Sequence, residues 1–438
     1  MDKAKKLNNT AYLHTLITNI NKLVLYRSIL KDEITILTCK MISSSIKSES
    51  IEKIESYYYE IANKLISEGE TEKYSGDLWK NHLVKSIILD ENSFSLMCEK
   101  TNTPIHTNMY NVALKDFEII KDLYNINFKS ILNIDPAIHN LITNYNNAQY
   151  EADNYFNKNF SYLTLSFEKN TADTMLNSVM KYYSEVGCGI FARYPAFYYD
   201  EGLVGVQKID NVYFKDLIGI EEQKKELINN TNSFINGIPS NNVLLYGDIG
   251  TGKSSSIKAL INQYQNNKLR LIELSRHQIR NFHNIINTVK NRGNRFIIFM
   301  DDLSFEEFET DYKYLKSVME GGILGSPENV LIYATTNRKH ILNEKLSERG
   351  NPSDELHVFE SMQEKLSLVD RFGVSIFFPS PNQVEYLKIV ESLAIKNKIN
   401  VPINEIKKEA LKWEMWHNGK SGRSANQFIH FLLSKNLE

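Results

Sequence analysis

The residues with the clearest chemistry form the segment GDIGTGKS, which matches the phosphate-loop pattern G-x-x-x-x-G-K-[ST] at every fixed position. Glycines there permit positive φ angles, so backbone N–H groups can surround phosphate oxygens at the positive end of a helix. Lys253 is expected to reach the β- and γ-phosphates, and the Ser254 hydroxyl to ligate Mg²⁺. We therefore predict ATP and Mg²⁺ as cofactors. The predicted contacts of the loop with the nucleotide are Gly247, Asp248, Ile249, Gly250, Thr251, Gly252, Lys253, Ser254 and Ser255.

Two adjacent acids, Asp301 and Asp302, end the apolar run RFIIFM. An acid at this place can hold Mg²⁺ together with Ser254, and the next acid can orient or deprotonate an attacking water. Asp302 stands where Glu is common, and its carboxylate lies about 1.5 Å further back because it is one methylene shorter. Glu306 and Glu307 could assist, or they could belong to a solvated helix start.

The run YATTN ends at Asn337, which could hydrogen-bond the attacking water or the γ-phosphate. Thr336 is the competing candidate for this role. Arg338 follows and is expected to face solvent or a neighbouring molecule. The predicted catalytic residues are Lys253, Asp301, Asp302, Asn337 and Arg371, and the predicted metal ligands are Ser254 and Asp301.

Two arginines outside the loop could stabilise phosphate charge. Arg371, in KLSLVDRFG, precedes the last predicted strand and so lies far from its own phosphate loop. In an oligomer it could reach the nucleotide of an adjacent copy. The alternative is that Arg371 only forms a salt bridge with Asp370. Arg349 is a weaker candidate for the same role between copies. Arg423 begins the last predicted helix, where a cation opposes the helix dipole unless an anion is bound nearby.

The elements that must position these residues alternate between buried strands and helices, which predicts a parallel sheet. In such sheets ligands bind at the carboxyl ends of the strands, where the polar residues above fall. The expected five strands are Asn241–Tyr246, Leu269–Leu274, Arg295–Leu303, Glu328–Asn337 and Val374–Pro381.

The regions on either side of this sheet have a helical pattern. We predict an N-terminal helical domain over 1–185, a core over 186–381 and a small helical lid over 382–438. Within the core, Phe214–Gly237 could wrap the adenine or could be a linker with an ordinary helix. In the N-terminal domain the tyrosine-rich pieces are expected to fill helix contacts, and histidines such as His82 to cap or pack.

The bulk composition is that of a globular protein, with 42% hydrophobic and 24% charged residues in 438. A net charge of −2 gives no general electrostatic reason to bind nucleic acid or an anionic membrane. Three widely spaced cysteines suggest neither a disulfide framework nor a zinc site. The start of the chain lacks a signal-peptide pattern, and no run is long enough to span a membrane, so we expect a cytoplasmic protein.

Five separated motifs, taken in order, resemble an AAA+ ATPase: LLYGDIGTGKSSSIKAL, FIIFMDDLSFE, YATTNRKHI, EKLSLVDRFG and SGRSANQFI. Over roughly residues 185–435 they are similar to a bacterial AAA+ family that carries only a domain-of-unknown-function label. In that family Asp-Asp after the strand is usual. The resemblance implies binding and hydrolysis of ATP, with Arg423 as a lid arginine and Arg371 as a finger, and it implies no substrate.

The predicted fold is thus an α/β AAA+ core with a five-stranded parallel sheet, a helical lid and a mostly α N-terminal domain. We expect an Mg-ATP-dependent ATPase that acts as a homo-oligomer, such as a ring, and remodels an unknown protein partner. One alternative is a nucleotide switch or scaffold with little hydrolysis. Another is a nucleic-acid-associated ATPase similar to helicase loaders.

Overall fold

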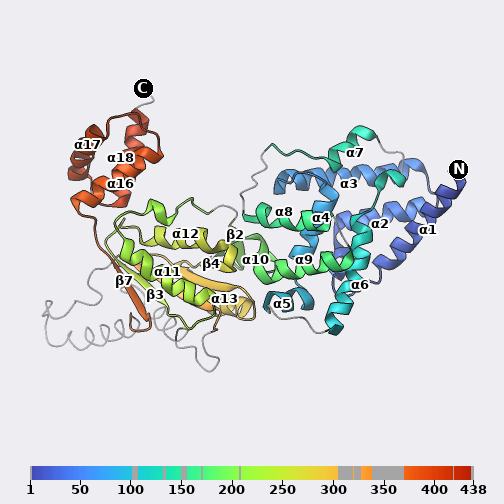
Figure 1. Cartoon of the computed structure of the whole chain (residues 1–438), viewed down its shortest axis with the longest axis horizontal. Helices are drawn as coiled ribbons and strands as arrows, with labels where there is room; N and C mark the ends of the chain where they lie inside the picture. Colours follow the sequence, from blue (N-terminus) through green and yellow to red (C-terminus); the bar gives the residue numbers. More distant parts are fainter. Residues whose placement is uncertain are drawn as a thin grey trace. The chain divides into compact units, whose positions relative to one another are not determined.

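The chain forms two compact units, Met1–Tyr194 and Pro195–Glu438, which are coloured along the sequence in Figure 1. The boundary between the two units falls between Tyr194 and Pro195. The computed structural model describes residues 2–100, 107–131, 135–148, 155–168, 171–206, 209–303, 319, 327–337, 369–417 and 419–435.

The first unit is helical, as its apolar periodicity predicts. Its long helices bury one face each; in the α6 helix, Phe117, Ile120 and Leu123 are all buried in the shared core. The described helices are α1 (Asp2–Ile20), η1 (Arg27–Lys31), α2 (Glu33–Ile46), α3 (Ile51–Glu72), α4 (Leu78–Leu89), α5 (Ser93–Lys100), α6 (Thr107–Tyr124), η2 (Phe128–Ser130), α7 (Pro136–Thr143), α8 (Tyr155–Phe167), α9 (Ala172–Glu185) and α10 (Ile190–Arg193).

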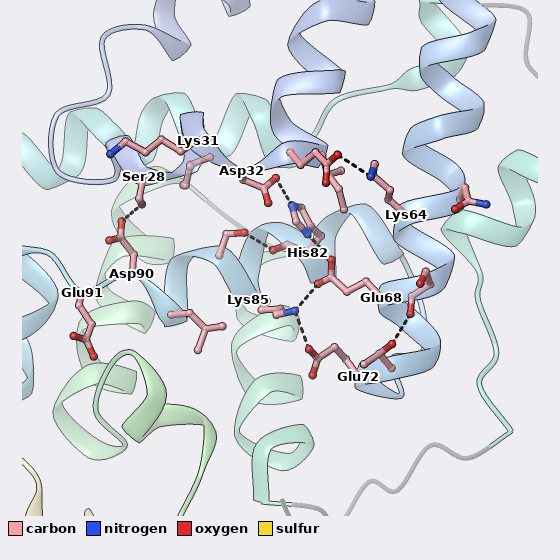
Figure 2. Close-up of a pocket in the computed structure, with 18 residues that line it drawn as sticks. Ser28, Lys31, Asp32, Lys64, Glu68, Glu72, His82, Lys85, Asp90 and Glu91 are labelled. Atoms are coloured by element: carbon pink, nitrogen blue, oxygen red, sulfur yellow. Dashed lines mark hydrogen bonds and ion pairs between the residues drawn. The ribbon is translucent and has the colours of Figure 1, made fainter. Parts of the chain in front are cut away.

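A pocket of about 860 Å³ in this unit is lined by η1, by α3 and α4, and by the first residues of α2 (Figure 2). An ion-pair chain of alternating charge runs along its wall. The buried ring of His82 lies 2.9 Å from Asp32 and 2.8 Å from Glu68. The Nζ atom of Lys85 then pairs with both Glu68, at 3.1 Å, and Glu72, at 2.8 Å. Burial alone would lower the pKa of His82. The hydrogen bonds and negative charges of the two carboxylates outweigh this effect and raise the pKa to about 9.

His82 should therefore make the helical unit less stable at high pH. Its folded pKa of about 9 exceeds the ordinary value of 6.5, so its contribution is complete below pH 6.5 and is lost as the pH rises through 9. That shift corresponds to about 3 kcal/mol. Urea unfolding of the full chain should show the free energy of unfolding falling between pH 7 and 9.5, whereas His82→Gln should flatten this fall. An equally steep fall in the variant would contradict the assignment.

The second unit is built on a mixed sheet of seven strands in the order β2-β1-β4-β5-β6-β3-β7. All neighbouring strands are parallel except the β1–β2 pair, which is antiparallel. The strands are β1 (Ala196–Tyr199), β2 (Leu203–Val206), β3 (Val243–Gly247), β4 (Leu269–Glu273), β5 (Arg295–Met300), β6 (Val330–Thr336) and β7 (Val374–Phe378).

The prediction of a five-stranded sheet was wrong in its strand number. The five expected parallel strands are present, and a hairpin of β1 and β2 extends the sheet beyond β4. Each hairpin strand has only four residues, and neither alternates between buried and exposed side chains. Periodicity therefore could not find them, and β1 gains its place from pairing with β4, a contact between residues far apart in the sequence.

Both faces of the four central strands, β3 to β6, are buried over most of their length, which explains their near-continuous apolar sequences. Leu245 and Ile297 share one core with α11 and α12, and the side chains that alternate with them, Leu244 and Ile298, are buried as well. The helices of this part are η3 (Phe214–Asp216), α11 (Glu221–Ile235), α12 (Lys253–Tyr264), η4 (Gln265–Asn267), η5 (Arg276–Asn281) and α13 (Phe282–Val289).

The C-terminal helices α16 (Gln383–Lys396), α17 (Ile403–Trp416) and α18 (Gly422–Lys435) enclose a small apolar core of their own. Tyr386 and Phe428 lie at its centre. These three helices fall within residues 382–438, the predicted lid, and are called the lid below. Nowhere in the part of the chain that the structure describes is a helix long and apolar enough to cross a membrane.

Candidate functional site

The loop between β3 and α12 has the backbone geometry that its glycines predict. Gly247, Gly250 and Gly252 have φ angles of +135°, +76° and +101°, which side chains with a Cβ rarely adopt. At Gly247 a Cβ would also lie 2.1 Å from the Phe378 carbonyl oxygen of the neighbouring strand. The loop therefore needs glycine for conformation and for space, and helix α12 begins at Lys253 directly after it.

Lys253 is folded into this loop and is only 5% exposed. Its Nζ donates to the backbone oxygens of Gly247 at 2.9 Å and Asp248 at 2.6 Å. Burial lowers the pKa of the amine, against the opposing charges of Asp248 and Asp301. A buried cation beside a helix N-terminus is a favourable place for a phosphate, whose charge would offset the desolvation.

Asp301 lies at the carboxyl end of β5 and contacts two hydroxyl groups. Ser254 Oγ donates to Asp301 Oδ1 at 2.6 Å, and Thr335 Oγ1 donates to the same oxygen at 2.5 Å. The Ser254 hydroxyl and the Asp301 carboxylate thus lie side by side next to the phosphate loop. Such hard oxygen ligands, few in number and completed by phosphate and water, fit Mg²⁺.

Asp302 is held by groups from two neighbouring strands. Its backbone N–H donates to Thr335 Oγ1 at 2.8 Å, and Asn337 Nδ2 donates to its Oδ1 at 2.6 Å. Arg276 Nη2 lies 3.3 Å from its Oδ2 and also donates to its backbone oxygen. The backbone of Asp302 has a φ of +53°, in the left-handed region. The structure therefore brings Asp301, Asp302 and Asn337 together.

Thr335 and Arg276 are site residues that the sequence reasoning missed. Each had a usable signal, because Arg276 follows β4 and Thr335 stands next to the last residue of β6, at the carboxyl edge where the other polar residues gather. Thr336, the competing candidate to Asn337, has a hydroxyl that is buried without a hydrogen-bond partner among the described residues. Side-chain alternation along β6 explains why Thr335, and not Thr336, contacts the acids.

The lid approaches the phosphate loop through the start of α18. The Gly422 N–H donates to the Gly250 oxygen at 2.9 Å, and a Cβ on Gly250 would lie 3.0 Å from the Cβ of Arg423. Ser421 caps the helix by accepting from the Ser424 N–H at 3.0 Å. The charge of Arg423 contributes to the lowered pKa of Lys253. Arg423 thus lies where a lid cation can approach a bound phosphate.

The segment before α11 lies between the loop and the lid. The side chain of Ile220 is 3.7 Å from where a Gly252 Cβ would stand. Asp216 forms an ion pair of 3.1 Å with Lys396 of the lid helix α16. These contacts place the start of Phe214–Gly237 against both the phosphate loop and the lid, which a plain linker would not require.

Arg371 lies away from this cluster, as its position in the sequence indicates. It precedes β7, whose first residue, Val374, pairs with Val243, the first residue of β3. The phosphate loop follows the other end of β3, roughly 16 Å away along five residues of strand. Arg371 is exposed at the amino edge of the sheet.

Some predicted candidates cannot be placed. Glu306, Glu307, Arg338 and Arg349 lie outside the described residues. The site described above rests on residues at or just beyond the carboxyl ends of β3, β4, β5 and β6, and on the start of the lid helix α18.

Gly250→Ala should destabilise the core and weaken ATP binding. The added Cβ would meet Arg423 of the lid, and the backbone φ of +76° at this position is strained for alanine. Overpacking of this kind costs about 1–3 kcal/mol. Gly419→Ala is the matched control, with a similar φ of +79° and nothing within 4 Å. Calorimetric unfolding and titration with ATP should separate the two variants. Equal effects would show that the contact with the lid is unimportant.

A family model described as "Protein of unknown function (DUF815)" matches residues 192–436, more than half of the chain. No curated protein matches the chain. Among solved structures, the Thermotoga maritima RuvB Holliday junction branch migration motor is 14% identical, with 51% of this chain and 72% of that chain covered and a TM-score of 0.33. C. elegans PCH-2 is 16% identical, and the match covers 51% of this chain and 71% of PCH-2 with a TM-score of 0.34.

Proposed function

The chain belongs to the DUF815 family over residues 192–436, and we propose that it is an AAA+ ATPase that binds and hydrolyses Mg-ATP. One observation carries this proposal: the Ser254–Asp301 contact of 2.6 Å beside a phosphate loop, with Asp302 and Asn337 joined at 2.6 Å next to it. These four side chains supply a metal site and a water site at one edge of the sheet.

The loop residues would bind the phosphates. Backbone N–H groups from Gly247 to Ser255 would surround the β-phosphate, with Lys253 turning from the loop carbonyls to the phosphate oxygens. Arg423 would add a second cation from the lid. Mg²⁺, held by Ser254 and Asp301, would neutralise charge on the phosphate oxygens.

Asp302 and Asn337 would act on the attacking water. Asn337 would fix its orientation, and the Asp302 carboxylate would accept its proton as the new bond to the γ-phosphorus forms and the bond to the ADP oxygen breaks. The contact between the two side chains supports these roles, because a donor and an acceptor that lie together could both reach one water. Both carboxylate oxygens of Asp302 are engaged by Asn337 and Arg276, which favours slow basal turnover and keeps a nucleotide switch as the second candidate function.

Arg371 would complete the site of an adjacent copy. Its exposed position at the opposite edge of the sheet supports this role, since it lies too far from its own loop to contact the same nucleotide. The active form would then be a homo-oligomer. Nucleotide turnover would move the lid through the Gly422–Gly250 hydrogen bond and remodel an unknown protein partner.

Lys253→Ala should abolish ATP binding, while Asp302→Asn should retain binding and lose turnover by roughly 10²–10⁴-fold, the usual contribution of a general base. Lys258→Ala is the control for the first variant, because it is the same substitution at a partly exposed position of the same helix. Binding of a fluorescent ATP analogue and Mg²⁺-dependent phosphate release measure both effects. Wild-type turnover in Asp302→Asn would move the base role elsewhere, and a wild-type protein that binds ATP without releasing phosphate would favour the switch.

Mixing variants tests whether Arg371 acts between copies. Arg371→Ala retains a working loop and Lys253→Ala retains a working arginine, so mixed oligomers should recover part of the lost hydrolysis. Mixtures of Lys253→Ala with Asp302→Asn should not recover to the same extent, because both defects damage the same half of the site. If mixed oligomers form by native mass measurement and the first mixture stays inactive, Arg371 does not act in trans.

A further inference from the structure

The helical unit holds another pocket, smaller than the charged one in Figure 2 and lined by different residues. It has a volume of about 130 Å³, and its walls come from α3, the start of α4, the segment around η2 and α7. The exposed Asn127 and the half-buried His139 lie in its wall, so the pocket reaches the surface of the unit. A cavity of about 150 Å³ holds one benzene molecule. This pocket therefore has room for one compact group.

Three buried aromatic side chains, Tyr58, Trp79 and Phe128, line this pocket. The Phe128 ring centroid lies 5.5 Å from that of Trp79, with the ring planes at 88°, and 5.9 Å from that of Tyr58, with the planes at 58°. Rings at such angles bound a space on more than one side. The Trp79 Nε1 donates to the Leu123 oxygen at 3.0 Å, so the polar edge of this ring is already satisfied. The faces of aromatic rings attract cations, most strongly where water is excluded.

Two polar groups of the pocket wall lack a partner that a ligand could supply. Asp77 is half-buried, and its Oδ1 accepts from the Lys80 N–H at 3.0 Å, but no cation forms an ion pair with it in the described part of the chain. The ammonium of Lys80 lies instead 4.9 Å from the centroid of the Tyr124 ring. The hydroxyl of Tyr58 is buried and has no hydrogen-bond partner among the described residues. A positively charged ligand would compensate the carboxylate, and an N–H on it could donate to Tyr58.

The charges around the pocket favour a cation. Asp77 is the one lining residue among those described that is charged at pH 7, because burial and the charge of Lys129 lower the pKa of His139 below its ordinary 6.5. Burial raises the pKa of the Asp77 carboxyl, against the bonds and charge of Lys80, and the negative charge of Glu168 acts in the same direction as burial. A bound cation would stabilise this carboxylate, whereas a bound anion would be repelled by it.

We propose that this pocket is a binding site for an alkylammonium group, with the three aromatic rings around its alkyl substituents and the Asp77 carboxylate beside its charge. A neutral ring or branched alkyl group of the same size would fill the space but leave Asp77 uncompensated, so it should bind more weakly. The group could belong to a methylated lysine of a protein partner or to a free choline-like molecule, which share this chemistry. The site lies wholly in the helical unit, and the inference does not depend on ATP hydrolysis.

The first test is calorimetric titration of the full chain with choline and with the alcohol in which a tert-butyl group replaces the trimethylammonium group. Choline should bind at one site at least about tenfold more tightly, because the uncharged alcohol loses the attraction between a desolvated cation and the ring faces. Sodium chloride keeps the ionic strength equal in the two titrations. Equal affinities would show an apolar cavity that does not select for charge, and absence of choline binding would show no site. Either result overturns the proposal.

The second test removes the charge and one ring. Asp77→Asn keeps a side chain that can cap α4 and should weaken choline binding by at least about fivefold, the upper end for an exposed ion pair, without weakening binding of the alcohol. Asp135→Asn, the same substitution at the cap of α7 outside the pocket, is the matched control and should bind choline as wild type does. Phe128→Leu keeps an apolar side chain without the ring and should also weaken choline binding, with urea unfolding as the check on its fold. Unchanged choline affinity in both pocket variants would place the bound choline elsewhere and overturn the proposal.

A third titration distinguishes the two sources of the group. It uses a peptide with one trimethyllysine among glycines and serines, and the same peptide with unmodified lysine. Tighter binding of the trimethyllysine peptide than of choline would support a protein partner. Binding of choline without binding of either peptide would support a free small molecule. Equal binding of the two peptides would overturn the role of the aromatic rings, because these should prefer the methylated cation.

Discussion

The parallel register of β5, β6 and β3 is the constraint on which the candidate site depends. Because these strands run in one direction, their last residues and the loops beyond them meet at one edge. Pairing of Met300 with Ala334 and of Tyr246 with Thr336 sets Asp301, Thr335 and the phosphate loop side by side. A shift by one residue would turn Thr335 away from the acids and replace its hydroxyl with the next side chain.

The phosphate loop is also the point where the lid meets the core. Gly250 provides a positive φ for the phosphate nest and a surface without a side chain, against which the start of α18 lies. One residue type would thus serve the proposed binding of phosphate and the approach of Arg423. This arrangement would give a direct physical route from the presence of phosphate to the position of the lid.

The helical unit has a different kind of organisation. Its charges compensate one another along the chain from Asp32 through His82, Glu68 and Lys85 to Glu72, in which His82 is buried and the others are half-buried (Figure 2). Removing a partner of the buried His82 leaves its charge uncompensated, which is usually more costly than losing a surface pair. The network thereby makes the packing of η1, α3 and α4 dependent on all of its members.

The sequence by itself determined the phosphate loop, the acids after β5 and the position of Arg371 before β7, because each depends on a short local pattern next to a buried strand. Tertiary structure alone decided the partners of these groups. That Thr335, and not Thr336, reaches Asp301 follows from strand alternation, and Arg276 reaches Asp302 only because β4 lies beside β5. The β1–β2 hairpin and the charge on His82 likewise arise from contacts between residues far apart in the chain, which no local spacing records.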